Sequence, residues 1–236
     1  MDQPARAEPD EYRQHRFTPP PGAADVLLVR HGESQPASPD AEFPMRDGHA
    51  DPPLDAVGHV EAQALAERLA SEEVSAIYVT PLQRTAQTAA PLAERLGLLP
   101  RVAADLREVH LGEWEGARFR INVRRGHPIA QRVFDEERWD VIPGAEATDA
   151  FAARVRGGMG GIGAAHPDQR VAVFTHGGVI GMVVALATGG RPFAFIGADN
   201  ASITHLVVAG DTWILRRFND TAHLGTDLDR PVQPLT

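Results

Sequence analysis

The sequence predicts an α/β protein, a three-layer α/β/α sandwich around a mostly parallel central sheet with an antiparallel edge strand. Short continuous apolar runs, such as residues 26–29 and 171–174, are typical of strands that are buried on both faces of a sheet. Segments with helical periodicity separate these runs along the chain, which predicts parallel strands joined by helices. Near the carboxyl terminus, two strand-like segments follow each other across a short turn, which predicts an antiparallel hairpin at the sheet edge.

The composition predicts one folded domain. The chain has 236 residues, of which 43% are hydrophobic and 23% are charged, a balance typical of globular proteins with a sizeable core. We expect residues 25–225 to form the domain and residues 226–236 to form a C-terminal tail. Residues 1–24 are rich in proline and charge, so we expect a flexible N-terminal arm. This arm lacks the apolar stretch of a secretory signal.

In the first half of the chain, the apolar run at residues 25–30 predicts the first strand. Residues 35–53 carry several prolines and little periodicity, which predicts a loop whose length favours a functional role. Asp55 is a candidate N-cap for a helix over residues 55–68. The apolar stripe that should pack this helix on the sheet consists of Val57, Val60, Ala64, Leu65 and Leu69.

Residues 76–79 predict the next strand, and a strong helix start follows it. Thr80 and Gln83 have the spacing of a capping box, and Pro81 suits the first helical position. Gly97 marks the end of this helix. The helix should therefore begin just beyond the carboxyl end of a strand.

In the second half of the chain, Phe151, Val155 and Ile162 share one face of an expected helix over residues 150–163. Four glycines lower the helix propensity of this segment. The remaining expected elements are a strand at residues 170–175, a helix that ends near Thr188, and hairpin strands at residues 202–208 and 212–218.

The charge balance and the residue types exclude several classes of protein. The chain has 23 Lys+Arg and 32 Asp+Glu, a net charge of −9, which disfavours nucleic-acid binding because that binding depends on clustered cations. No apolar run approaches the roughly 20 residues of a membrane helix. Cysteine is absent, which excludes disulfides and thiol catalysis, whereas ten histidines leave imidazole chemistry open. We expect a cytoplasmic protein.

Two histidines occupy equivalent places in the sequence. His31 and His176 each follow a predicted strand and precede a glycine, and ligand sites in parallel sheets lie beyond the carboxyl ends of the strands. Arg30 stands beside His31, and Arg84 lies in the first turns of a predicted helix. Guanidinium N–H donors match phosphate or carboxylate oxygens. These residues predict an anion pocket built around histidine.

Four ordered segments carry these residues. They are LVRHGES at residues 28–34, TPLQRTAQTA at residues 80–89, LRE at residues 106–108 with GEWEG at residues 112–116, and THGG at residues 175–178. Together they resemble the histidine phosphatase superfamily, also called the phosphoglycerate mutase-like family. The resemblance implies the phosphoglycerate mutase-like fold. The short interval between Glu108 and His176 resembles that of the phosphatase branch.

The resemblance implies a metal-independent phosphatase that works through a phosphohistidine. His31 would be the nucleophile, with one ring nitrogen free to attack and the other donating its hydrogen to a backbone carbonyl. Arg30, Arg84 and His176 would surround the phosphoryl oxygens, and Glu108 would be the general acid and base. The substrate would be a small phosphorylated molecule, with neither a metal ion nor a cofactor required. The implied substrate-binding residues are Arg30, His31, Ser34, Arg84, Glu108, His176 and Gly177.

The sequence leaves two other functions open. It also leaves the oligomeric state open, and a homodimer is among the open alternatives. A mutase of the phosphoglycerate type would return the phosphoryl group from His31 to a second hydroxyl of the substrate. A non-catalytic protein would keep the pocket only to bind a phosphorylated ligand. Inactive relatives commonly lose one of the site residues, whereas this chain has all of them.

Two further groups of residues lie outside these roles. His49, Asp51 and His110 suggest metal ligands, but no pair of ligands stands at a helical spacing, so we do not expect a metal site. A basic run after the acid segment either meets a second anionic group of the substrate or forms a solvated helix face. This run consists of Arg118, Arg120, Arg124, Arg125 and His127.

Overall fold

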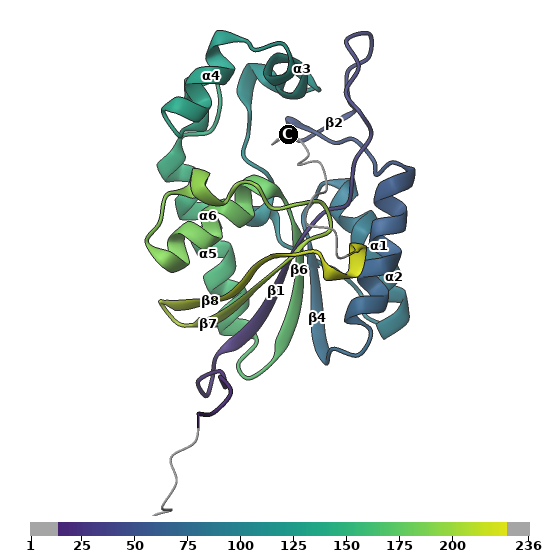
Figure 1. The fold of residues 1–236 in the computed structure, drawn as a ribbon, viewed down its shortest axis with the longest axis vertical. Coiled ribbons are helices and arrows are strands. Elements are labelled where there is room, and N and C mark those ends of the chain that lie inside the picture. Colours follow the sequence, from purple (N-terminus) through teal and green to yellow (C-terminus); the bar gives the residue numbers. More distant parts are fainter. Residues whose placement is uncertain (1–13, 226–236) are drawn as a thin grey trace, which may run out of the picture.

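A six-stranded sheet forms the centre of the protein in the computed structural model, which describes residues 14–225. Residues 1–13 of the expected arm and the expected tail at residues 226–236 lie outside the described part. The strand order is β5-β4-β6-β1-β7-β8 (Figure 1). The strands are β1 (Ala24–Arg30), β4 (Val74–Val79), β5 (Arg101–Val102), β6 (Arg170–Thr175), β7 (Ile203–Ala209) and β8 (Thr212–Asp220).

The pairing of these strands confirms the expected mostly parallel sheet. β6 pairs in parallel with both β1 and β4, and β4 pairs in parallel with β5. β7 runs antiparallel to β1 and to β8. The hairpin of β7 and β8 therefore forms one edge of the sheet, as the sequence predicted.

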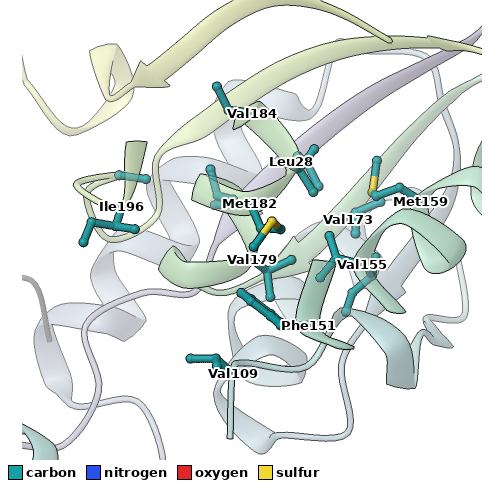
Figure 2. Packing of buried hydrophobic residues seen from close by; sticks show 14 of the residues in the cluster. Leu28, Val109, Phe151, Val155, Met159, Val173, Val179, Met182, Val184 and Ile196 are labelled. Atoms are coloured by element: carbon teal, nitrogen blue, oxygen red, sulfur yellow. The ribbon is translucent and has the colours of Figure 1, made fainter. Parts of the chain in front are cut away.

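Helices cover both faces of the sheet and complete the three layers. α1 (Ala56–Leu69) and α2 (Gln83–Leu96) lie on one face, and α5 (Thr148–Ala165) and α6 (Gly177–Thr188) lie on the other (Figure 1). In β1, Leu27 and Val29 belong to the core under α1 and α2, whereas Val26 and Leu28 belong to the core under α5 and α6. Figure 2 shows Leu28 among the residues of this second core. Both faces of β1 are buried, as predicted.

A smaller group of elements lies beyond the carboxyl ends of β1 and β6 (Figure 1). It comprises the hairpin of β2 (Met45–Arg46) and β3 (His49–Ala50), together with α3 (Arg118–Arg124) and α4 (Pro128–Asp135). The hairpin lies within the expected proline-rich loop. The described chain also contains short 3-10 helices at Ala104–Leu106, Gly112–Trp114, Trp139–Val141, Pro192–Phe195 and Ala222–Leu224. Within the described residues, no helix is both long enough and apolar enough to span a membrane.

The predicted cap of α1 is confirmed, whereas only the C-terminal part of the predicted apolar stripe is buried. Oδ1 of Asp55 accepts a hydrogen bond of 2.8 Å from the Gly58 amide. Val57 and Val60, however, are 52% and 69% exposed. A Cβ atom at Gly58 would lie 2.0 Å from the carbonyl oxygen of Glu33, so the backbones meet there. The glycine side of the helix therefore faces inward, and the two valines face outward.

The start of α2 corrects the predicted capping box. The helix begins at Gln83, and its N-cap, Leu82, makes no side-chain cap hydrogen bond. The hydroxyl of Thr80 instead accepts from the Leu82 amide at 3.3 Å and lies 2.9 Å from His176. A buried partner in the site therefore competes with the expected cap. At the other end, Gly97 adopts a left-handed conformation with φ of 65° and confirms the predicted helix end.

Two glycines of α5 should respond in opposite ways to alanine. At Gly157 a new Cβ atom would meet no atom within 4 Å, so Gly157→Ala should raise the free energy of unfolding by about 1 kcal/mol through helix propensity. At Gly163 the Cβ atom would lie 2.5 Å from Cγ1 of Val208, so Gly163→Ala should lower the free energy of unfolding by about 1–3 kcal/mol. Urea denaturation of both variants checks this. Stabilisation by both substitutions would contradict the packing of α5 on β7.

Candidate active site

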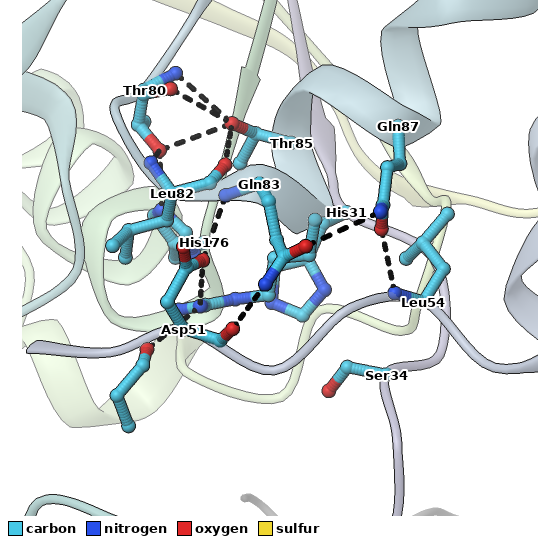
Figure 3. Close-up of polar contacts among 12 residues, drawn as sticks. His31, Ser34, Asp51, Leu54, Thr80, Leu82, Gln83, Thr85, Gln87 and His176 are labelled. Atoms are coloured by element: carbon cyan, nitrogen blue, oxygen red, sulfur yellow. Dashed lines mark hydrogen bonds and ion pairs between the residues drawn. The ribbon is translucent and has the colours of Figure 1, made fainter. Parts of the chain in front are cut away.

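The two predicted histidines lie side by side at the carboxyl ends of adjacent strands. β1 and β6 pair in parallel with Arg30 opposite Thr175, which places the residues that follow these strands next to each other. The rings of His31 and His176 are 5.2 Å apart between centroids (Figure 3). The sequence predicted both positions, and the register of the sheet brings the two rings together.

One hydrogen bond fixes the tautomer of His31. Nδ1 lies 2.8 Å from the carbonyl oxygen of Gly32, and because a carbonyl only accepts, Nδ1 must carry the hydrogen. The lone pair is then on Nε2. This geometry is the one expected of a nucleophilic imidazole. Nδ2 of Asn200 donates to the carbonyl of His31 itself at 2.9 Å, which holds the backbone of the segment.

His176 is fully buried and is positioned by Thr80. Its Nε2 lies 2.9 Å from the Thr80 hydroxyl (Figure 3), whereas its Nδ1 is buried and has no hydrogen-bond partner among the described residues. Buried polar atoms in proteins nearly always have a partner. Nδ1 of His176 is therefore a buried polar atom beside His31 that still needs a partner.

Burial and nearby cations keep both histidines uncharged. Removal from water lowers the pKa of His31 and of His176 well below the usual 6.5, and the guanidinium groups of Arg84 and Arg30 lower both values further. At neutral pH both rings are therefore neutral. An imidazole nitrogen can act as a nucleophile only when its ring is neutral.

The two predicted arginines are buried beside the histidines. Arg84 donates to the carbonyl of Ala50 at 3.0 Å, and its Nη1 lies 4.0 Å from Oδ1 of Asp51. Burial lowers the pKa of Arg84 to about 10, so the side chain is still charged at neutral pH. Arg30 donates to the carbonyl of Ala198 at 2.6 Å. Both cations are thus held in place before any ligand binds.

Glu108 enters the site from the segment between two turns of 3-10 helix. Its Oε1 accepts from the Val109 amide at 2.9 Å, and its Oε2 accepts from the Gly178 amide at 3.2 Å. A Cβ atom at Gly178 would lie 2.5 Å from Oε1. The glycine at the start of α6 therefore allows the carboxyl group to reach the site.

A cavity of about 120 Å³ joins most of the predicted residues. Those that line it are Arg30, His31, Arg84, Glu108 and Gly177. Ser34 lies at its border, where the hydroxyl accepts a hydrogen bond of 2.7 Å from Arg120, which also lines the cavity. Apolar side chains form much of the remaining wall, and they include Phe43, Leu82, Trp114, Phe119 and Trp139.

Sequence reasoning missed three contributors to the site. The spacing of Thr80 predicts a helix cap, which is a usual role of such a side chain in a loop, and Asn200 is not among the residues that the sequence assigned to the site. Arg120 was one of a run of arginines with no signal to single it out. For Thr80, its place directly after a buried strand is the one sequence signal that it shares with His31 and His176.

The residues that suggested metal ligands have other partners. Oδ1 of Asp51 accepts from the Gln83 amide at 2.7 Å. The rings of His49 and His110 meet edge to face, with centroids 5.0 Å apart. Across residues 14–225, no three metal-ligating side chains come together as a group.

The two neutral histidines should make the protein less stable in acid. Unfolded histidine binds a proton below pH 6.5, whereas the folded pKa of each is well below that value. Below pH 6.5 the unfolded state therefore binds more protons, and the free energy of unfolding should fall by up to about 1.4 kcal/mol per pH unit for each histidine. Urea denaturation between about pH 7.5 and pH 5 should show a shallower fall for His31→Ala than for wild type. Equal slopes would contradict a neutral, buried His31.

Comparisons with known proteins agree on one family. Residues 26–221 match the family model of the histidine phosphatase superfamily (branch 1). Phosphoglycerate mutase-like protein 4 of Arabidopsis thaliana is 34% identical over 206 residues, which cover 85% of this chain and 87% of the relative. The metal-independent phosphoserine phosphatase of the same plant is 31% identical over 207 residues, which cover 86% of this chain and 84% of the relative.

A solved structure extends the similarity to three dimensions. The native structure of mycobacterial glucosyl-3-phosphoglycerate phosphatase superposes with a TM-score of 0.67 at 28% sequence identity. The match covers 84% of this chain and 100% of the other. The likeness therefore extends over most of this chain and over the whole of the other.

Proposed function

Because the chain belongs to the histidine phosphatase superfamily, we propose that it hydrolyses phosphomonoesters through a phosphohistidine on His31. The observation that carries the proposal is the 2.8 Å hydrogen bond from Nδ1 of His31 to the carbonyl of Gly32. It leaves the lone pair on Nε2, in a ring that burial and two arginines keep neutral. The family and the named phosphatases among its members support phosphatase activity.

In the first step, Nε2 of His31 forms a bond to phosphorus while the bond to the leaving oxygen breaks. Charge in this transition state is spread over the three non-bridging oxygens. Arg30 and Arg84 offer donors to these oxygens from positions that are fixed in advance. When the Thr80 hydroxyl donates to Nε2 of His176, the hydrogen of that ring lies on Nδ1, which then donates to the phosphoryl group as well.

Glu108 serves both halves of the reaction. In its protonated form it gives a proton to the leaving alcohol. Its carboxylate then takes a proton from the water that attacks the phosphohistidine, which releases inorganic phosphate and restores neutral His31. The amides of Val109 and Gly178 orient the carboxyl group for this work.

Activity should be independent of divalent metal ions. Arg30 and Arg84 supply the positive charge that a metal ion would otherwise provide at the phosphoryl oxygens. We expect phosphate release to be unchanged after treatment with EDTA. Activity that vanishes on chelation and returns only with added magnesium or manganese would contradict this part of the mechanism.

Phosphate release from a panel of phosphomonoesters tests the proposed function. One arm of the panel is 3-phosphoglycerate with a trace of 2,3-bisphosphoglycerate, and there we expect free phosphate. Formation of 2-phosphoglycerate without free phosphate would assign mutase transfer instead. Binding of the esters without any turnover would assign a non-catalytic, ligand-binding protein.

A further inference from the structure

The segment that carries Glu108 has no regular secondary structure of its own. Residues 107–110 lie between the 3-10 helices Ala104–Leu106 and Gly112–Trp114 and belong to neither a helix nor a strand. Other groups must therefore satisfy and hold this backbone. A general acid has to lie within hydrogen-bond reach of the leaving oxygen, so the position of this backbone bears directly on the first chemical step.

Arg154, on α5, donates to three carbonyl groups of the segment. Its Nη1 donates to the carbonyls of Asp105 at 2.8 Å and Arg107 at 2.7 Å, and its Nη2 donates to the carbonyl of Glu108 itself at 3.0 Å. The intervening carbonyl, at position 106, accepts from the Thr175 hydroxyl at 2.7 Å. Two side chains therefore hold four consecutive carbonyl groups.

Glu146 takes the remaining donors of Arg154 and holds the next part of the segment. Nε and Nη2 of Arg154 donate to the two carboxylate oxygens of Glu146 at 2.6 and 2.7 Å, a bidentate geometry that fixes the plane of the guanidinium. Oε2 of Glu146 also accepts from the His110 amide at 3.3 Å, and the Glu146 amide donates to the His110 carbonyl at 2.9 Å. With the three carbonyls, the carboxylate uses all five N–H donors of Arg154.

The pair of Arg154 and Glu146 is largely shielded from solvent. The two side chains are 12% and 17% exposed. Burial by itself raises the pKa of the Glu146 carboxyl, but the hydrogen bonds and the charge of Arg154 outweigh it and hold that pKa below the usual 4.5. The guanidinium also lies 4.7 Å from the ring centroid of the buried Phe151, on the same helix. At neutral pH the two side chains therefore form a fixed ion pair.

Arg154 reaches the site only through the segment that it holds. Among the described residues, those that line the cavity include Glu108 and Val109 but not Arg154. A displacement of about 1 Å at a reacting group costs on the order of 10²-fold in rate. Support of the backbone at Glu108, and on both sides of it, is therefore large enough in principle to govern proton transfer.

We propose that Arg154 is the positioning residue of the general acid, and that with Glu146 it clamps the backbone of residues 105–110 so that the carboxyl group of Glu108 is aimed at the leaving oxygen. This inference rests on the proposed phosphatase function and adds two residues to the same site. The amides of Val109 and Gly178 orient the carboxyl group itself, whereas the clamp places the residue that carries it. The clamp thus serves the step that needs a proton.

Two esters with leaving groups of similar size test the proposal. Benzyl phosphate releases an alcohol that needs a proton, whereas p-nitrophenyl phosphate releases a stable phenolate. With enzyme in excess, release of the alcohol or the phenol in a single turnover measures the first step alone. Arg154→Met should slow release from benzyl phosphate about 10- to 100-fold and release from p-nitrophenyl phosphate by no more than about threefold. Equal losses on both esters, or no loss on either, would overturn the proposal.

A double variant shows whether Arg154 acts through Glu108. In Glu108→Gln the proton donor is already missing, so adding Arg154→Met should slow release from benzyl phosphate by no more than about a further twofold. Independent roles would multiply the two single losses, and that result would contradict the proposed clamp.

Milder variants and a matched control separate positioning from folding. Arg154→Lys keeps the charge but cannot span three carbonyls, so it should restore part of the loss on benzyl phosphate. Glu146→Gln should show a smaller loss, again mainly on benzyl phosphate. Arg156→Met is the control, because Arg156 is exposed on the same helix and lies 5.9 Å from the ring centroid of Trp213, and both rates should stay at the wild-type values. Where urea denaturation finds Arg154→Met unfolded, the ratio of the two rates in Arg154→Lys and Glu146→Gln decides the question.

The wild-type enzyme keeps this inference distinguishable from the proposed function. Wild-type protein that releases neither the alcohol nor the phenol would refute the proposed function, and the role of Arg154 with it. Wild-type activity together with equal losses on both esters in Arg154→Met would refute the role of Arg154 alone.

Discussion

Replacing His31 with alanine should abolish phosphate release, with a loss of about 10⁴-fold or more. The size of the effect follows from the role of the ring as covalent acceptor, because alanine has no atom that can form the intermediate. The arginines and Glu108 would still surround the substrate, so binding should survive while turnover disappears. Phosphate release under saturating substrate is the measurement.

His59 provides a matched control for this substitution. It is an exposed histidine on α1, and His59→Ala should retain wild-type turnover. Full activity in His31→Ala would end the proposed mechanism. Loss of activity in both variants would point to a general effect of removing imidazole groups and not to a nucleophile at position 31.

Replacing Glu108 with glutamine should slow the reaction by an amount that depends on the leaving group. Glutamine keeps the size of the side chain and one oxygen that can accept from the amide of Val109 or of Gly178, but it cannot transfer a proton. General acid catalysis contributes about 10²- to 10⁴-fold, so we expect a loss of that size for alkyl phosphates. The loss should be clearly smaller for p-nitrophenyl phosphate, whose phenolate leaves without a proton.

The single-turnover burst is the right measurement for Glu108→Gln. Glu108 also activates water in the second step, so steady-state rates would combine the two roles. Glu113→Gln is the matched control, because Glu113 is an exposed carboxylate close by on the same segment. Equal burst losses for both leaving groups would assign Glu108 to phosphate positioning or to folding, and not to proton transfer.

The sequence predicted the parts of the site that follow from local patterns. His31 and His176 each come directly after a predicted buried strand, and such positions lie at the ligand-binding edge of a parallel sheet. Their roles came from the motif resemblance. Their closeness depends on the pairing of β1 with β6, which no local pattern specifies.

The parts that the sequence did not predict depend on tertiary contacts. Thr80 has the residue type and spacing of a helix cap, and only the packed structure shows that its hydroxyl contacts His176. Val57 and Val60 fit a helical stripe, but the contact between Gly58 and Glu33 turns the other side of α1 inward. Arg120 could not be distinguished from Arg118 because α3 has only 7 residues, too few for periodicity to define a buried face.

Trapping the phosphorylated enzyme tests the central claim most directly. Wild-type protein is mixed with a phosphomonoester, denatured in alkali within the first turnover, and digested for mass spectrometry, because a phosphohistidine survives alkali but hydrolyses in acid. The account predicts one phosphoryl group on the peptide that contains His31, lost on acid treatment and absent from His31→Ala. Turnover without any phosphorylated His31, or the same modification on another residue in both proteins, would contradict it.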